Sequence, residues 1–321
     1  MIKIPIKKTR LEELAKIQYE LIKNNLEKRL GKLINGFRNP VDQSSSDFLQ
    51  ILNKIQSNLK TIITSDLTEL GIFLASNPEI ANFNYENEFS GKKYKNLILN
   101  LFGYKTWRTN FGGEFFSELE IKVCPYCNEN YTLSIDRRTK KKALIEFDHF
   151  LPKKHFPYFS MSIFNLIPSC SICNRQKLDM KQTKELTEFS PYELINKKIL
   201  SFIFDQEKFL DDKGKIKIKY MNDNKTLEEL YNQFLIEERY NQHIDIANEI
   251  KEKSNSFREE YIEDLAKNHG LSYEEIYRYL YGTFFSKKEF LKRPLSKFTR
   301  DLIEDLNPEF IKKIEEELTE D

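Results

Sequence analysis

All four cysteines of this 321-residue chain lie in two C-x-x-C pairs, Cys124/Cys127 and Cys170/Cys173, with 42 residues between the pairs. Two such pairs are the usual way in which a chain presents four thiolates to one zinc ion. The alternative is a redox pair, but a redox C-x-x-C normally stands alone after a strand, and here no cysteine lies outside the two pairs. Disulfides are disfavoured because we find no export signal. We therefore predict a structural Zn²⁺ site made by these four residues.

A second group of side chains could act on a phosphodiester bond. Asp148 and His149 follow the apolar residues IEF, and Asn174 follows Cys173 at an expected helix start. Carboxylate and amide oxygens are good ligands for Mg²⁺, and an imidazole can take a proton from water near neutral pH. Neighbouring side chains in a strand point to opposite sides, so Asp148 and His149 share a cleft only if the strand end is distorted.

Taken one at a time, these residues carry little information. Asp148 and His149 are each more typical of polar surface positions, and Asn174 alone would be interpreted as a helix N-cap. The ordered set within CPYC, EFDHFLPKKHFP and NLIPSCSICNRQK is what indicates a catalytic site.

In this order the segment resembles the HNH endonuclease family with the ββα-metal fold, in its zinc-stapled form. The resemblance covers about 55 residues. It implies that Asp148 and Asn174 bind a catalytic Mg²⁺ or Mn²⁺ and that His149 is the general base. It also implies that Asn165, in FNLIP, orients the catalytic loop by hydrogen bonding. Asn rather than His at position 174 matches the subtype found in RNA-guided DNA nucleases.

Positively charged side chains near this segment are expected to contact phosphates of the substrate. They are Lys153, Arg175, Lys177, Arg137 and Arg138. For each of them a solvated surface position is the alternative.

The charge of the chain is unevenly distributed although the net charge is only +1. Residues 1–60 and 121–185 each carry 12 basic and 6 acidic side chains, whereas residues 221–321 carry 15 basic and 24 acidic ones. We expect a polyanion to contact only part of the molecule. We expect the acidic C-terminal part to hold a protein partner, a second subunit or an autoinhibitory position. No apolar run approaches the length that spans a membrane, so we expect a cytoplasmic protein without a membrane partner.

The elements that position these residues are expected to be mostly helical. Apolar residues at helical spacing predict a helix over 9–35, a polar loop over 39–46, helices over 47–65 and 66–75, and a partly helical segment over 92–119 broken at Gly103 and Gly112–Gly113. Strands over 131–135 and 143–147 flank a cationic turn, and strands over 199–204 and 215–221 follow. Thr226 is an N-cap candidate for the helical remainder.

The predicted fold class is mainly α with a small α+β core, in which the ββα-metal module and its zinc site lie between helical regions. The domains would be a helical region over 1–120, the nuclease core over 121–190, and a strand pair followed by helices over 191–321. The predicted function is hydrolysis of phosphodiester bonds in DNA by a metal-dependent endonuclease. The alternatives are an inactive zinc-dependent nucleic-acid- or protein-binding module and an RNase of the same fold.

The family resemblance also implies a biological setting. Bacterial HNH proteins with these motifs look like the nuclease components of anti-phage systems, including the Septu type. That resemblance implies an ATPase or another defence protein as a partner, and a homo-oligomer remains open.

Overall fold

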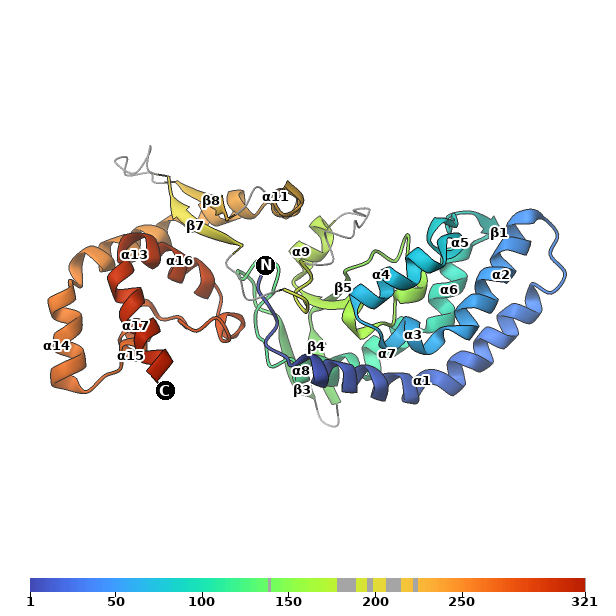
Figure 1. Cartoon of the computed structure of the whole chain (residues 1–321), viewed down its shortest axis with the longest axis horizontal. Coiled ribbons are helices and arrows are strands. Elements are labelled where there is room, and N and C mark those ends of the chain that lie inside the picture. The colour runs from blue at the N-terminus through green and yellow to red at the C-terminus, as the bar shows by residue number, and fades with distance from the viewer. Residues whose placement is uncertain (138–139, 178–188, 195–198, 206–214, 222–224, 321) are drawn as a thin grey trace.

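The computed structural model places two helical parts on either side of a small central region (Figure 1). It describes residues 1–137, 140–177, 189–194, 199–205, 215–221 and 225–320. Within those ranges the chain is mainly helical, and its strands form two-stranded antiparallel sheets. This agrees with the expected fold class of mainly α with a small α+β core. None of the described helices is long and apolar enough to cross a membrane.

The N-terminal helical part begins with a 29-residue helix, α1 (Lys8–Gly36), as the apolar spacing predicts. Its buried face includes Leu11, Leu26 and Leu30. The elements that follow in this part are α2 (Gln43–Ser57), α3 (Leu59–Thr64), α4 (Leu67–Ser76), α5 (Pro78–Asn82), β1 (Glu88–Phe89), β2 (Lys92–Lys93), α6 (Tyr94–Phe102), α7 (Tyr104–Asn110) and α8 (Gly112–Glu118).

The start of α2 differs from the prediction. A loop was expected over 39–46, but the helix begins at Gln43 because Asp42 caps it. The Asp42 carboxylate accepts from the backbone N–H of Ser45, and the Ser45 hydroxyl accepts from the N–H of Asp42. This reciprocal cap satisfies backbone N–H groups that have no partner at a helix start. The serine-rich stretch is therefore part of the first turn of α2.

The breaks in the 92–119 segment fall where the glycines predict them. Gly103 has a φ of 69°, a left-handed conformation, and separates α6 from α7. Gly112 begins α8. The turn at Gly103 sets the direction of α7, which contacts the central region.

The central region contains two hairpins and a short helix. β3 (Leu133–Arg137) pairs with β4 (Lys140–Leu144), and β5 (Glu146–His149) pairs with β6 (Leu166–Ser169). The single strand expected over 143–147 is thus divided at Ile145, because its first part pairs with β3 and its second part with β6. Two 3₁₀ turns, η1 (Pro157–Phe159) and η2 (Ile163–Asn165), lie between β5 and β6. The helix α9 (Ser171–Gln176) follows β6 directly, so β5, β6 and α9 form a strand–strand–helix unit.

The C-terminal part contains a hairpin and a set of helices. Its elements are β7 (Leu200–Phe204), β8 (Ile216–Tyr220), α11 (Lys225–Gln233), α12 (Ile236–Tyr240), η4 (Asn241–His243), α13 (Ile244–Ser256), α14 (Glu259–His269), α15 (Tyr273–Tyr281), η5 (Phe290–Lys292), α16 (Ser296–Leu306) and α17 (Pro308–Glu320). Both expected strands are present. Thr226 lies within α11 rather than capping it, and Gly270 ends α14 in a left-handed conformation.

The first cysteine pair lies where the N-terminal segment and the C-terminal part meet the central region. The backbone N–H of Ile2 donates to the Pro125 carbonyl at 2.8 Å, and the N–H of Lys122 donates to the Leu291 carbonyl at 2.7 Å. The Asn128 amide donates to the Phe290 carbonyl at 2.7 Å. In Figure 1 the N-terminus accordingly lies at the centre of the molecule.

Candidate functional site

The four cysteines form one compact group. Their Sγ atoms all lie within 4.8 Å of one another, and all four residues are buried. The Sγ atoms of Cys127 and Cys170 are 4.0 Å apart. A tetrahedral zinc ion with Zn–S bonds of about 2.3 Å would place its sulfurs about 3.8 Å apart, so the spacing fits such an ion. The group could therefore bind a metal ion such as zinc, and it offers four ligands with no open position.

Local structure brings the second cysteine pair into place. Cys170 precedes α9, and its Sγ accepts from the backbone N–H of Cys173 at 3.4 Å, as an N-cap does. The C-terminal part adds Arg239 of α12, whose guanidinium lies 3.5 Å from the Cys173 Sγ and also pairs with Glu129. A cation beside a thiolate stabilises its charge, which favours metal binding.

Asp148 lies on β5 and is held by two donors. The Tyr126 hydroxyl donates to its Oδ2 atom at 2.6 Å, and the Lys177 ammonium donates to the same atom at 2.5 Å. Tyr126 stands between the first two cysteines, and Lys177 follows α9. Both donors therefore tie the carboxylate to segments that the four-cysteine group connects.

His149 is the last residue of β5 and is 4 % exposed. Its Nε2 atom lies 3.1 Å from the Ser160 carbonyl oxygen. A carbonyl can only accept, so Nε2 carries the proton in this contact and Nδ1 has the free lone pair. Burial lowers the pKa of His149 well below its usual value, and the nearby Lys153 lowers it further. The imidazole is thus neutral at pH 7.

Asn165 does not line the cleft that Asp148 and His149 share, which is described below. It supports the loop that follows β5 beside that cleft. Its Oδ1 atom accepts from the backbone N–H of Leu151 at 2.5 Å, and its amide donates to the carbonyls of Leu151 and Phe159. The side chain is buried and joins the segment after β5 to the segment before β6. Its hydrogen bonds are those of an orienting residue.

The structure brings Asp148, His149 and Asn174 to one cleft of about 820 Å³. The two neighbours on β5 reach the same cleft because His149 lies where the chain leaves the strand. Asn174 lies on the first turns of α9, directly after Cys173. A carboxylate, an imidazole and an amide thus share a space with room for a cation and a phosphate.

The basic residues expected to contact phosphates have different positions. Lys153 is exposed and lines the cleft, and Arg175 is exposed on α9 outside it. Lys177 is turned inward, with a side chain 2 % exposed, and donates to Asp148 and to the carbonyls of His149 and Phe150. A buried ammonium with three acceptors is not placed to contact an outside phosphate, so Lys177 supports Asp148 instead. Arg137 ends β3, and Arg138 lies outside the described residues.

The sequence analysis missed the contribution of α7 to this cleft. Tyr104, Lys105 and Arg108 line it, and the Tyr104 ring meets the His149 ring edge-on with centroids 4.7 Å apart. No spacing rule could have found these residues, because they lie about 40 positions before β5 and the contact is tertiary. The one available signal was the helix break at Gly103, which predicts where α7 begins.

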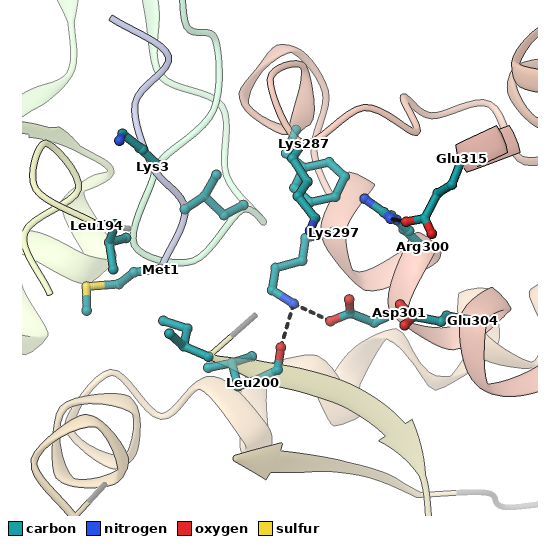
Figure 2. Close-up of a pocket in the computed structure, with 13 residues that line it drawn as sticks. Met1, Lys3, Leu194, Leu200, Lys287, Lys297, Arg300, Asp301, Glu304 and Glu315 are labelled. Atoms are coloured by element: carbon teal, nitrogen blue, oxygen red, sulfur yellow. Dashed lines mark hydrogen bonds and ion pairs between the residues drawn. The ribbon is translucent and has the colours of Figure 1, made fainter. Parts of the chain in front are cut away.

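A smaller cavity of about 140 Å³ lies between the N-terminal segment and α16. In Figure 2 the Lys297 ammonium donates to the Leu200 carbonyl and to Asp301, and Arg300 pairs with Glu315. The charges of these four side chains are therefore paired within the cavity wall. The cavity contains none of the residues predicted to carry chemistry.

Comparisons with other proteins add nothing to this description. No protein-family model matches the chain, and neither a curated protein nor a solved structure matches it. What the structure establishes is a four-cysteine group that could bind a metal ion such as zinc, next to a cleft lined by a carboxylate, an imidazole and an amide.

Proposed function

We propose that this chain is a metal-dependent HNH-type endonuclease that hydrolyses phosphodiester bonds in DNA. The observation that carries the proposal is the convergence of Asp148, His149 and Asn174 on one cleft. These residues also stand in the order of the HNH motif, on a strand–strand–helix unit.

Asp148 and Asn174 would hold the catalytic Mg²⁺ or Mn²⁺. Both donors to Asp148 bind Oδ2, so Oδ1 is the oxygen left to face a cation. Hard divalent cations prefer carboxylate and amide oxygens and keep several waters. Such an ion, when bound, polarises the phosphodiester and stabilises the leaving oxygen.

His149 is the proposed general base. Ser160 fixes the tautomer in which Nδ1 is free, and Tyr104 fixes the plane of the ring. Nδ1 would take the proton of the attacking water, so that the hydroxide forms only at the phosphorus. Asn165 would act indirectly, because its side chain holds the loop that carries Leu151.

The four-cysteine group is proposed to bind Zn²⁺ as a structural ion. It is closed and buried, and a site without an open position does not activate water. Its role is to fasten α9 to the first cysteine pair, so that Asn174 from α9 and Asp148 from β5 have fixed relative positions. Zinc binding at such sites contributes directly to folding.

The proposed substrate contacts are to phosphates rather than bases. Lys153 lies in the cleft and Arg175 lies exposed on the adjacent helix. Contacts of this kind set affinity and register without reading sequence. Sequence preference, if the enzyme has one, would have to come from another part of the molecule.

The HNH resemblance extends the proposal to the biological setting. We place the chain in the cytoplasm, in bacterial anti-phage defence of the Septu type, with an ATPase or another defence protein as its partner. The acidic residues 221–321 are the proposed partner-facing part, because they would repel DNA.

Plasmid nicking with and without added Mg²⁺ or Mn²⁺ tests the proposal. Wild type should cleave only with the metal, and His149→Ala should lose cleavage by about 10²–10⁴-fold, the usual contribution of a general base. Equal background from the two proteins at equal purity would favour a binding module without activity. A parallel assay on labelled single-stranded RNA decides between DNA and RNA as the substrate.

A further inference from the structure

One wall of the cleft comes from the N-terminal helical part. The residues that line the cleft include Lys95 and Leu99 of α6, and Tyr104, Lys105 and Arg108 of α7. None of the residues that line it comes from α1.

Several contacts fix α7 against the strand that carries Asp148 and His149. The Arg108 guanidinium donates to the Ile145 carbonyl at 2.8 Å and pairs with Glu146 at 3.2 Å. The Trp107 ring packs edge-on against Phe147 with centroids 5.6 Å apart. The position of α7 relative to β5 is therefore set by the polar contacts of Arg108 and by the ring packing of Trp107.

The positive charges at this wall are not all neutralised. Arg108 is paired with Glu146, but Lys105 is exposed and has no ion pair with any residue in the described ranges. The Lys153 ammonium lies 5.3 Å from the centre of the Tyr104 ring. Tyr104 is the neighbour of Lys105 on α7. A free ammonium and a second one nearby form a site for an anion.

The surroundings of Lys153 point the same way. Its side chain as a whole is exposed, but its ammonium lies against Tyr104 and is partly withdrawn from water, which lowers the pKa of Lys153. Asp148 and Glu146 counteract this shift, while Arg108 and Lys105 add repulsion. An anion placed between these cations would relieve that repulsion.

We propose that Lys105 and Lys153 together bind phosphates of the nucleic-acid substrate, so that α7 forms part of the substrate-binding surface. The inference rests on the proposed function in taking DNA as the ligand. Lys105 would be a substrate-positioning residue that acts through binding. The N-terminal helical part would then hold the substrate as well as pack against the core.

Binding measured apart from cleavage tests this inference. Fluorescence anisotropy with a short labelled DNA duplex, without added Mg²⁺ or Mn²⁺, gives the affinity over a range of salt concentrations. Each phosphate contact contributes about 0.9 to the slope of log affinity against log salt. Lys105→Gln should reduce the slope by about 0.9, and Lys105→Gln with Lys153→Gln by about 1.8. Lys60→Gln, at an exposed position of α3 outside the cleft, is the matched control and should leave the slope unchanged.

The outcomes separate this inference from the proposed function. If Lys105→Gln and the double variant bind with the slope of Lys60→Gln, or if wild type does not bind DNA, α7 is not a phosphate-binding wall, whatever the cleavage assay shows. The other outcome is that the slopes change as expected while wild type and His149→Ala have equal cleavage background. In that case α7 binds phosphates, and the nuclease proposal fails. Circular dichroism of each variant confirms that it is folded.

Discussion

The four-cysteine group and the cleft lie in the same central region but are built in different ways. The cysteine group is closed: its ligands come from two short turns, and all of them are buried. The cleft is open: Asp148 and His149 come from a strand end, Asn174 from a short helix, and one wall from α7. The first arrangement can hold an ion permanently, and the second can admit a substrate.

This difference divides the expected effects of substitution. Changes at the closed group should act on folding, because removing one ligand leaves the other thiolates buried around an incomplete site. Changes in the cleft should act on chemistry or binding, because its side chains are supported from several directions.

Removal of one cysteine of the proposed zinc site is expected to have the largest effect on stability. Structural zinc sites in small domains contribute about 10–16 kcal/mol of apparent binding free energy, so Cys170→Ser should unfold the central region or lower its thermal midpoint strongly. Ile172→Ala is the control, because this residue lies between the second two cysteines and is 44 % exposed. The measurements are bound zinc by elemental analysis and thermal unfolding by circular dichroism. An unchanged midpoint without zinc would show that the group is not a structural metal site.

Lys177→Met should destabilise the protein by about 3 kcal/mol. Removing one partner of a buried ion pair leaves the other charge uncompensated, and both side chains here are at most 9 % exposed. Urea unfolding measures the loss, with Arg175→Gln as the neighbouring exposed control. Added Mg²⁺ should recover part of the lost stability if Asp148 binds the ion. A variant as stable as the control would show that Lys177 does not compensate Asp148.

Tyr104 belongs to the N-terminal helical part but touches the imidazole of His149 in the cleft. Tyr104→Phe keeps the ring and should cleave nearly as wild type does. Tyr104→Ala removes the ring from His149, and we expect cleavage to fall by about tenfold or more, since small misplacements at a reacting centre cost up to about 10²-fold. Single-turnover rates measure this. Equal rates for the two variants would mean that Ser160 alone orients the imidazole.

The smallest effect is expected at Arg175. The residue is exposed on α9 outside the cleft, so Arg175→Gln should reduce the salt slope of DNA binding by at most about 0.9 and leave stability unchanged. Anisotropy at several salt concentrations measures the slope. A larger reduction than that of Lys105→Gln would show that the main phosphate contacts come from α9 and not from α7.

The sequence was most informative where geometry is local. The spacing of Cys124, Cys127, Cys170 and Cys173 predicts their cluster, because a C-x-x-C turn presents two sulfurs to one point. Asp148, His149 and Asn174 could be assigned to one cleft because the cysteines connect their elements. Helix starts were less reliable: Asp42 begins α2 four residues earlier than the apolar pattern suggests.

The sequence could not predict contacts between residues that are far apart in the chain. Lys177 has the sequence context of an exposed basic residue on a helix, yet its ammonium is buried against Asp148. The contacts of Tyr104 and Arg108 with β5 depend on how α7 docks, which no local pattern encodes. The same holds for Arg239, which reaches Cys173 from the C-terminal part.

The most direct test of the account compares chemistry with binding in the three residues that meet in the cleft. Single-turnover cleavage of labelled DNA with Mg²⁺ should fall by about 10²-fold or more in each of Asp148→Asn, His149→Ala and Asn174→Ala, while the DNA affinity of each folded variant stays within about threefold of wild type. Cleavage that persists at the wild-type rate in His149→Ala, with folding and purity confirmed, would contradict the assignment of this cleft as the active site.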